Sequence, residues 1–534
     1  MSLISRPYPK SNPTRIIAAL LMWAGVMAAP LLAQTAQQPG LASQGDQAEP
    51  APLAPLSAIP WLEELAATPP SDQQPNEAPV ADGAAAPQVT ATPLDPAAQG
   101  GVGLLPQATS GLPPDLWSRS QADQIARAFD ALPDVLPLPL ADLRLRLLLA
   151  EASAPAGAAG DAFLLTRTSV LTRLGALPQA QALLDQASPL TPAVFARAAD
   201  VALLTGESDA ACGALSGQPH LSDDLGLRVF CLARGQDWSA AALTLQSASV
   251  IGALDDRSTT LLAQFLEPDL ADDGPPPVGD GEVSPLDFRL YEAIGAPLST
   301  ADLPRPFAAA DLSPNMGWKA QLDAAERLAA TGAIEPNQLL GLYTQRIPAA
   351  SGGVWDRAEA IQRLDRALAT RDPGAIGTAL PRAEGAMAAV GLDAAFARMF
   401  APRLTGSLPL AAAPAAVRAR VLLLSPDYER AADLADAPGF AAAVALGDTD
   451  AAVAATPLEA AIAPAFGLDI PQSDLQSLAA EGELGLAILT AMRRISEARE
   501  GDISGLGGAL GFLRSVGLED TARQSALSLL LDGT

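Results

Sequence analysis

Two cysteines and one histidine are the residues with the most distinctive chemistry in this chain of 534 residues. Cys212 and Cys231 are its only cysteines, and an even pair in an exported chain suggests a disulfide. A tight turn near Gln218 between two helices would leave Cys231 roughly 9 Å too far along the helix axis to meet Cys212, at 1.5 Å per residue. The loop that contains Pro219 would have to shift the register. Two buried free thiols are the alternative.

The sequence contains no recognisable active site. His220 is the single histidine, and beside two paired cysteines it leaves no zinc site of ordinary composition. No HExxH, clustered CxxC, P-loop or Gly-x-Ser-x-Gly pattern occurs. Paired carboxylates could hydrolyse glycosides without histidine, yet no pair stands out among 60 acidic residues. We therefore expect no catalytic residue, no cofactor and no metal.

The charge of the chain excludes several kinds of partner. The formal net charge is −27, and lysine occurs only at Lys10 and Lys319. Such a surface repels phosphate backbones, whose binding depends on neutralisation by Lys and Arg. Nucleic acid and the face of an anionic membrane are therefore poor candidates.

The first 33 residues have the layout of a signal peptide. Arg6, Lys10 and Arg15 precede an apolar run at 16–29, and Ala33 offers a small residue for cleavage. The run is shorter than the roughly 20 residues that span a bilayer. Its extension across residues 30–33 leaves an uncleaved N-terminal anchor as the alternative. The pattern predicts export to the periplasm of a Gram-negative envelope, with no membrane insertion after cleavage.

Residues 34–114 are dense in Pro, Ala, Gln and Gly, and predict a disordered stalk. An apolar island at residues 59–65 interrupts it and contains Trp61, Leu62 and Leu65. This island is a candidate docking motif that could bind a partner protein as a helical turn. The alternative is an apolar cluster that packs back onto the folded body.

A repeat begins after residue 160. Gly175, Gly206 and Gly235 each end a helical run, and each is followed five positions later by Ala and then by Leu. A left-handed Gly, a short turn and a second helix with small residues at the contact would explain this spacing. One such pair cannot bury its own apolar face, so neighbouring pairs stack. The alanines and leucines are Ala180, Ala211 and Ala240, then Leu183 or Leu184, Leu215 and Leu243. The pattern returns at Gly447 with Ala452 and at Gly517 with Ala522.

The folded body is expected to be all-α, with little or no sheet. Ser120 is a candidate N-cap for a helix through Leu132, and residues 141–151 predict a second helix. We expect a helical repeat domain at 115–268, an acidic Pro/Gly linker at 269–285 and a second helical repeat domain at 286–534. Apolar stripes support helices in the second domain. They comprise Trp318, Leu322, Ala325 and Leu328; Trp355, Ala358, Ile361 and Leu368; and Leu484, Ile488, Met492 and Ile495.

The repeat resembles the tetratricopeptide repeat, a helix–turn–helix unit, most closely at residues 427–431 (DYERA). The large aromatic positions of that repeat are mostly Ala or Leu here, so the resemblance implies a degenerate α-solenoid. The whole layout also resembles uncharacterised exported proteins of alphaproteobacteria, through the signal, the stalk and residues 89–95, 103–117 and 229–233. That resemblance implies a periplasmic setting and no known activity. Some members carry an antifreeze-glycopeptide label, although Ala-Ala-Thr occurs only at 66–68, 329–331 and 454–456.

Two functions are consistent with these features. The first is a non-enzymatic periplasmic helical-repeat scaffold that binds a protein or peptide. The alternative is a cell-envelope hydrolase that acts on glycans with carboxylates on a helical superstructure. That alternative predicts a deep cleft holding a buried acid with a raised pKa.

Overall fold

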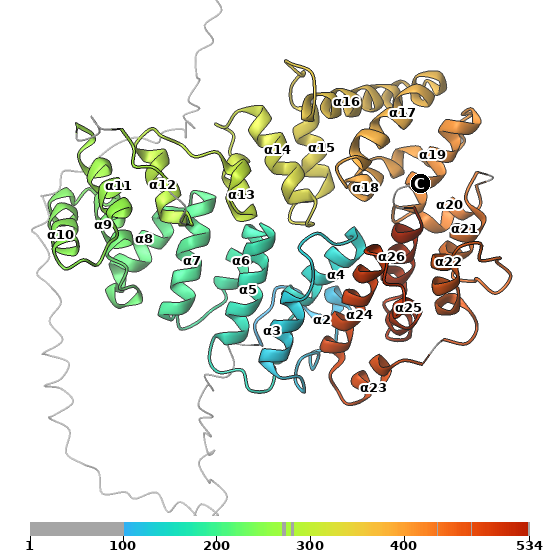
Figure 1. Cartoon of the computed structure of the whole chain (residues 1–534), viewed down its shortest axis with the longest axis horizontal. Coiled ribbons are helices and arrows are strands. Elements are labelled where there is room, and N and C mark those ends of the chain that lie inside the picture. The colour runs from blue at the N-terminus through green and yellow to red at the C-terminus, as the bar shows by residue number, and fades with distance from the viewer. Residues whose placement is uncertain (1–100, 270–273, 279–281, 435, 471, 532–534) are drawn as a thin grey trace, which may run out of the picture. The chain divides into compact units, whose positions relative to one another are not determined.

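The computed structural model describes residues 101–269, 274–278, 282–434, 436–470 and 472–531 (Figure 1). These residues fold into α-helices and short 3-10 helices. No strand occurs in the described ranges, where only two isolated bridges join Leu105 to Ala150 and Gln121 to Ala156. The all-α prediction is confirmed. The predicted signal peptide, residues 34–100 and the candidate docking motif lie outside the described residues.

The helices before the predicted linker are mostly short, and aspartate side chains begin several of them. Asp224, Asp237 and Asp255 each accept a hydrogen bond from a backbone N–H in the first turn of the helix that follows. These bonds satisfy donors that a helix start leaves free. The helices are α2 (Gln107–Ser110), α3 (Ala122–Asp130), α4 (Leu138–Leu149), α5 (Ala162–Leu174), α6 (Leu177–Leu184), α7 (Pro192–Thr205), α8 (Ser208–Gly217), η2 (Pro219–Leu221), α9 (Leu225–Arg234), α10 (Trp238–Val250) and α11 (Asp256–Leu266).

The helices from residue 285 onward include the longest of the chain. The apolar stripes predicted on α14, α16 and α24 are buried, apart from the half-buried Trp355 and Leu484. The helices are α12 (Pro285–Ala293), η4 (Thr300–Asp302), η5 (Arg305–Phe307), α13 (Ala308–Asp311), α14 (Trp318–Ala329), α15 (Pro336–Thr344), α16 (Val354–Thr370), α17 (Pro373–Ala388), α18 (Asp393–Leu404), α19 (Ala412–Leu423), α20 (Tyr428–Ala432), α21 (Gly439–Leu446), α22 (Pro457–Ile462), η6 (Ala463–Phe466), α23 (Asp474–Ala480), α24 (Leu484–Arg499), α25 (Leu506–Ser515) and α26 (Glu519–Leu531).

Consecutive helices pack in pairs, and eight of the turns that the structure describes share one geometry. A residue in the left-handed conformation lies in the turn, and the residues five and nine positions later are buried on the second helix. Positions four apart lie on one helical face, so each turn directs an apolar pair into the interior. The left-handed residues with their buried pairs are Gly175 with Ala180 and Leu184, Gly206 with Ala211 and Leu215, Gln236 with Ala241 and Leu245, Arg371 with Ile376 and Leu380, Gly391 with Phe396 and Phe400, Gly482 with Ala487 and Ala491, Gly501 with Leu506 and Leu510, and Gly517 with Ala522 and Ala526.

The third repeat has a different register from the predicted one. Gly235 follows α9 with a φ of −75°, and Gln236 takes the left-handed φ of 65° instead. Counted from Gln236, the buried leucine is Leu245, whereas the predicted Leu243 is 65% exposed. The other two predicted turn glycines of this repeat do adopt the left-handed conformation.

Two of the later predictions have different outcomes. Gly447 is left-handed and ends α21, but the next helix begins only at Pro457, so Ala452 lies in a loop and not on a second helix. Gly517 is left-handed, and Ala522 is buried on α26 as predicted.

The packed chain begins before Asp115. The backbone N–H groups of Leu104 and Leu105 donate to the carbonyl oxygen of Leu149 at 2.8 and 2.9 Å, so the end of the predicted stalk is ordered from residue 101 onward. The N-cap of α3 is Gln121 and not Ser120, because the side chains of Gln121 and Gln124 form a reciprocal capping box.

The predicted linker is tied to its neighbours wherever it is described. The Tyr291 hydroxyl donates to the carbonyl oxygen of Pro276 at 2.8 Å, and Arg257 donates to that of Val278 at 2.8 Å. Helices from the two sides of the segment also meet, since α12 packs on α7 and Arg289 of α12 donates to the carbonyl oxygen of Leu204 at 3.0 Å.

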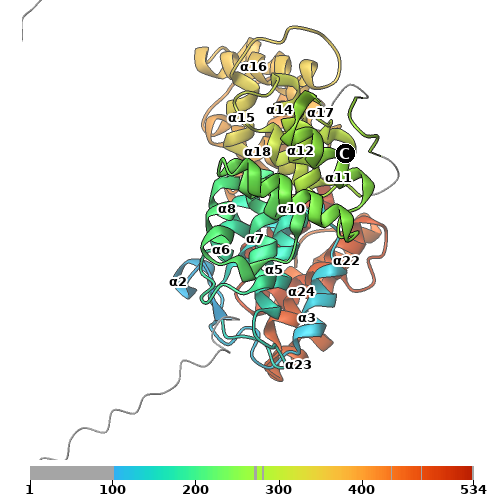
Figure 2. The same cartoon turned by 90° about the vertical axis from the view of Figure 1, so that its left-hand side faces the viewer.

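The last helices pack against the first ones. Helix α24 contacts α3, and the two lie side by side in Figure 2; α26 contacts α4, as Figure 1 shows. The backbone N–H of Gly485 on α24 donates to the carbonyl oxygen of Leu116 at 3.1 Å, and Arg146 on α4 donates to the Thr521 hydroxyl of α26 at 3.1 Å. A Cβ atom on Gly485 would lie 2.3 Å from the ring of Trp117. Consequently one hydrophobic core joins both ends of the described chain.

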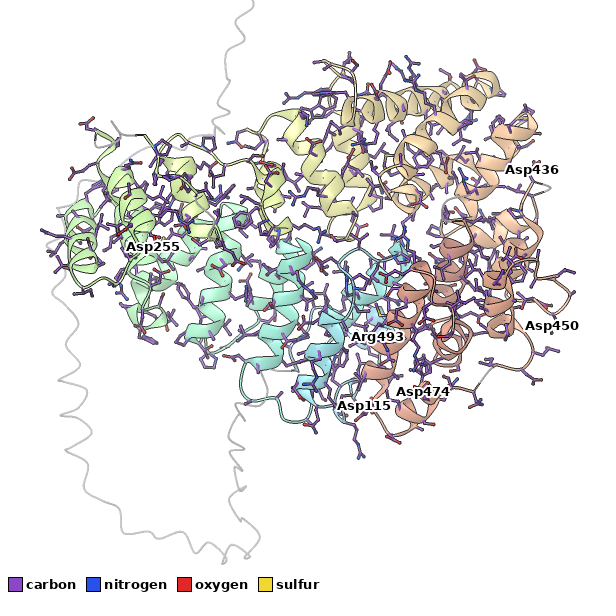
Figure 3. All side chains as sticks on the ribbon, in the orientation of Figure 1. Asp115, Asp255, Asp436, Asp450, Asp474 and Arg493 are labelled. Atoms are coloured by element: carbon purple, nitrogen blue, oxygen red, sulfur yellow. A yellow bond between two sulfur atoms is a disulfide. The ribbon has the colours of Figure 1, made fainter. Side chains whose placement is uncertain are left out.

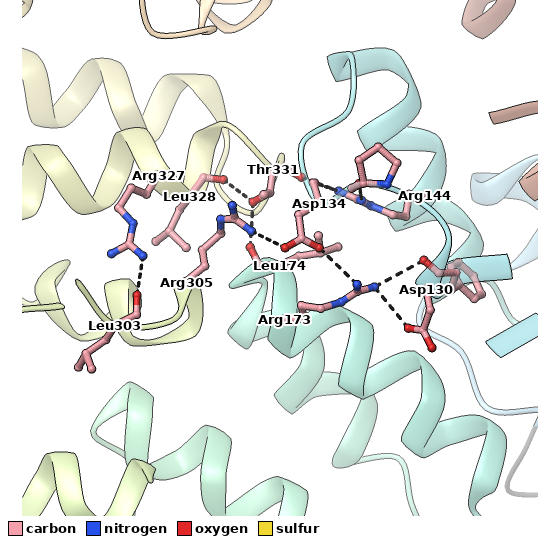
Figure 4. A network of polar contacts seen from close by, with 12 residues as sticks. Asp130, Asp134, Arg144, Arg173, Leu174, Leu303, Arg305, Arg327, Leu328 and Thr331 are labelled. Atoms are coloured by element: carbon pink, nitrogen blue, oxygen red, sulfur yellow. Dashed lines mark hydrogen bonds and ion pairs between the residues drawn. The ribbon is translucent and has the colours of Figure 1, made fainter. Parts of the chain in front are cut away.

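A buried arginine network reinforces the contact between α4–α5 and the segment around α14 (Figure 4). Arg144 is 1% exposed and donates to the carbonyl oxygens of Pro133, Asp134 and Thr331. The Asp134 carboxylate accepts a hydrogen bond from Arg305 at 3.0 Å and lies 3.5 Å from a nitrogen of Arg173. Burial lowers the pKa of Arg144 to about 10, so the residue is charged at neutral pH.

Candidate functional site

Helices α8 and α9 form an antiparallel hairpin that a disulfide closes. Cys212 on α8 is bonded to Cys231 on α9, with Cα atoms 5.0 Å apart, which confirms the predicted bond. Arg234 donates two hydrogen bonds to the Asp209 carboxylate, at 2.9 and 2.5 Å. The two contacts share one register, because each partner lies three positions from a cysteine along its own helix.

The loop between the two helices sets this register. Residues 218–224 include the 3-10 helix η2 and an extended stretch, so the hairpin is centred near Leu221 and not near Gln218. Arg228 donates to the carbonyl oxygens of Pro219 and Ser222 at 2.9 and 2.8 Å. The Asp224 carboxylate accepts the backbone N–H of Leu227 at 3.0 Å and begins α9. The shift needed to join the cysteines therefore comes from a loop longer than a tight turn.

A cavity of about 580 Å³ lies over the hairpin. Its apolar wall is formed by the disulfide with Leu215, Leu232 and Pro219, and its polar wall by Asp209, Asp237, Arg228, Arg234 and Ser216. The volume is in the range typical of ligand pockets.

The polar groups around the hairpin cavity are occupied by contacts within the protein. Asp209 binds Arg234, and the Asp237 side chain accepts the backbone N–H of Ala240 at the start of α10. Both arginines are held as well, Arg234 by Asp209 and Arg228 by backbone carbonyls. The cavity is thus close to neutral, and its carboxylates are not placed as a free acid–base pair. It is suited to an apolar group with some polar contacts.

Helix α10 follows Asp237, which lines this cavity, and carries exposed apolar side chains. It packs against α9 and α11 on one side, and Asp255 begins α11 (Figure 3). Leu243 is 65% exposed and Val250 is 82% exposed; they lie seven residues apart and so on one face of the helix. Ile251, directly after the helix, is 71% exposed.

An aromatic cluster connects the start of α10 to the hairpin. Trp238 is 51% exposed, and its ring centroid lies 6.4 Å from that of Phe265. Phe265 stacks on Phe230 of α9 at 5.6 Å, and the guanidinium of Arg234 lies over Phe230 at 5.7 Å. We call the surface formed by the hairpin cavity, Trp238, Leu243, Val250 and Ile251 the α10 surface.

The two acids whose pKa burial raises in the described residues lie on separate helices. Burial raises the pKa of Asp311, and Thr300 donates a hydrogen bond to its carboxylate. Burial also raises the pKa of Asp200. Neither residue lines the hairpin cavity, and the two lie on different helices, α13 and α7. A glycan hydrolase would need a pair of carboxyl groups flanking one cleft.

Two kinds of feature, a metal-ligand cluster and a membrane-spanning helix, are absent from the part of the chain that the structure describes. No group of three or more His, Cys, Asp or Glu side chains suited to a metal ion occurs in the ranges that the structure describes. In the same ranges no helix is both long and apolar enough to cross a membrane.

The fold and the disulfide define the class of protein at a coarse level: an all-helical protein of many helices packed in consecutive pairs, with one disulfide in the described part. The disulfide indicates an oxidising, extracytoplasmic location. Comparison with protein-family models, curated proteins and solved structures finds no match.

The sequence predicted the covalent part of this site and missed the rest. Cys212 and Cys231 meet as expected, and His220 lies in η2 between their helices. Trp238, Val250 and the cavity were not predicted, since each depends on the register of α10 and on the loop at 218–224. One signal was available: the apolar side chains of α10 are spread around the helix and are not gathered on one face.

Proposed function

We propose that this protein is a non-enzymatic periplasmic scaffold of degenerate tetratricopeptide-like repeats that binds a partner protein through the α10 surface. The partner contributes an extended or helical segment with aliphatic or aromatic anchors. The observation that carries the proposal is the exposure of Leu243, Val250 and Ile251 along and directly after the helix whose N-cap, Asp237, lines the hairpin cavity. Large apolar side chains clustered on an exposed surface are typical of interaction sites.

The exposed side chains of α10 support an apolar partner at this place. Helix α10 packs on α9 and α11, much as α6 packs on α5 and α7. Even so, Trp238, Leu243 and Val250 of α10 stay more than half exposed among the described residues. Each large aliphatic side chain gains roughly 1.5–3 kcal/mol on full burial, so covering this face would stabilise a complex substantially.

The charges of the cavity and of the whole chain indicate which kind of partner segment can bind. The ion pair and the capping bonds keep the cavity near neutral, so it does not attract a strongly charged segment. The chain as a whole carries −27 and repels acidic partners at a distance. A neutral or basic segment with apolar anchors fits both conditions.

Site-specific photo-crosslinking tests the proposal. A benzoylphenylalanine residue replaces Leu243 in the full chain, expressed at its natural level in the native host. Replacement of Leu468, which is 91% exposed, provides the control. We expect a discrete adduct from position 243 that a second substitution, Val250→Asp, strongly reduces, and no such adduct from position 468.

Three results would overturn the proposal. One is no adduct from position 243 in cells that contain the protein. Another is the same adducts from positions 243 and 468. The third is an adduct only to residues 59–65 of the chain itself, which would mean that this segment covers α10.

A further inference from the structure

Arg371 takes the left-handed position that six of the eight turns with a shared geometry give to glycine and one gives to Gln236. It follows α16 with a φ of 53°, a left-handed conformation that costs an L-amino acid roughly 1–2 kcal/mol. The side chain is exposed, and its guanidinium makes no hydrogen bond or ion pair with any residue that the structure describes. A charged residue in an unfavourable conformation, without a structural contact, indicates a role outside the packing of the turn.

The Arg371 side chain lines a cavity of about 520 Å³. The end of α16, the start of α17 and the end of α18 with the loop that follows enclose it. Leu368 and Ile376, which are 7% and 1% exposed, form an apolar wall. Arg403, Thr405 and Ser407 complete a polar wall with Arg371.

This polar wall carries positive charge and no carboxylate. Arg403 donates to the side chain and to the backbone oxygen of Asp365, at 2.6 and 2.9 Å, which orients it and leaves three of its five donors unused. The neighbouring Asp372 carboxylate is turned to the start of α17, where it accepts the backbone N–H of Gly374 at 2.9 Å. The cavity therefore offers guanidinium donors to a ligand. The neighbouring carboxylates, Asp365 and Asp372, accept hydrogen bonds from Arg403 and from the backbone of Gly374.

The sequence around this cavity also contains more basic than acidic residues. Residues 346–426 contain ten arginines and six acidic residues, whereas the whole chain has a net charge of −27. Two of these arginines pair with acids outside the segment, Arg357 with Glu326 and Arg398 with Asp142, so a small excess of positive charge remains near the cavity to oppose the charge of the whole chain.

We propose that this cavity binds a small organic anion, a carboxylate or a phosphate monoester that carries a short apolar group. Arg371 and Arg403 bind the anionic group, since guanidinium pairs match the geometry of carboxylate and phosphate oxygens. Leu368 and Ile376 contact the apolar group. This site is separate from the α10 surface and does not depend on the proposed scaffold function.

Calorimetric titration of the full chain tests this site with four probes: octanoate, octyl phosphate, octan-1-ol and inorganic phosphate. We expect octanoate, octyl phosphate or both to bind, and octanol and inorganic phosphate to bind at least about tenfold more weakly, because each lacks one half of the ligand. The tighter of the two amphiphiles identifies the anionic group that the cavity prefers.

Two variants separate binding from folding. Arg371→Gly removes the guanidinium and suits the left-handed φ, so the fold is retained; we expect at least about tenfold weaker binding of octanoate and octyl phosphate. Arg366→Ala removes an equally exposed charge on α16 outside the cavity and leaves binding unchanged. The proposal is overturned if neither amphiphile binds the wild type, if octanol binds as tightly as octanoate, or if Arg366→Ala weakens binding as much as Arg371→Gly.

Discussion

Arg144 and Arg167 are almost completely buried, and both are charged at neutral pH because burial lowers the pKa of each only to about 10. Arg167 donates to the carbonyl oxygens of Val102, Leu148 and Ala150, which would otherwise lack partners in the interior. The sequence could not predict this burial, because arginines in an apolar helical run usually reach solvent by their long stems. An arginine is buried here where backbone carbonyl oxygens of irregular segments accept its hydrogen bonds.

The buried Asp311 carboxyl should make the stability of the fold depend on pH. Burial raises its pKa above the ordinary value of 3.8, while the hydrogen bond from Thr300 partly opposes the change. Because the folded-state pKa exceeds the unfolded-state value, the group stabilises the fold fully below the unfolded pKa, and this contribution is lost as pH rises through the folded pKa. Asp311→Asn should therefore remove a gain in stability on acidification that the wild type shows between the two values.

Urea unfolding of wild type and Asp311→Asn across this pH window measures the effect of Asp311. Asp302→Asn changes an exposed acid on the neighbouring η4 and should keep the pH dependence of the wild type. Parallel pH dependences for wild type and Asp311→Asn would contradict the assignment.

At the scale of elements, the spacing of a turn residue and a buried residue five positions later was readable from the sequence. Gly175 and Gly206 follow the pattern that the sequence predicts, since an achiral residue favours the left-handed turn. The same turn also occurs at Gln236 and Arg371, which the sequence does not mark. The identity of the buried pair varies from Ala to Phe, so a search for Gly and Ala alone finds only part of the repeat.

Gln236 should be a weak point of the third turn. Gln236→Gly relieves the left-handed conformation at φ 65° and is expected to raise the free energy of unfolding by about 1 kcal/mol. Gly235→Ala, at a φ of −75°, should have little effect. Thermal melts of the two variants measure this difference, and destabilisation by Gly235→Ala together with no gain from Gln236→Gly would place the left-handed residue one position earlier.

The disulfide should act locally. On the chain-entropy model a loop of this length contributes about 3 kcal/mol. The hairpin belongs to a hydrophobic cluster around Phe230, Leu261 and Tyr291 that is distinct from the main core. Reduction should therefore speed amide hydrogen exchange in α8–α10 and leave α24–α26 unchanged. A uniform rise in exchange along the chain would show instead that the two clusters unfold together.

At the scale of the whole molecule, the contact of the last helices with the first was beyond prediction. It joins Trp117 to Gly485 and Arg146 to Thr521, pairs separated by more than half the chain, and no local pattern marks them. Gly485 appears in the sequence only as a glycine near a helix start. Its role depends on the Trp117 ring, which packs on Phe129 and Phe163 and needs the space where a side chain would stand.

Gly485→Ala tests this contact. The added Cβ would meet the Trp117 ring, and overpacking of this kind costs roughly 1–3 kcal/mol. Gly341 lies within α15, where an added Cβ atom would have no neighbour within 4 Å. Gly341→Ala should therefore stabilise the protein by about 0.5–1 kcal/mol, because alanine favours a helix more than glycine does. Chemical unfolding of both variants gives the comparison. Equal stability of Gly485→Ala and wild type would contradict the close approach of α24 to residue 117.

The α10 surface carries the functional proposal, and partner capture by the intact protein in living cells tests it most directly. The measurement places benzoylphenylalanine at position 251 both in the otherwise wild-type chain and in the double variant Leu243→Asp, Val250→Asp, and compares their crosslinked adducts and thermal melts. Both residues are exposed, so the melts should agree. We predict a discrete partner adduct from the wild type that the double variant lacks; the same adducts from both proteins would contradict the account.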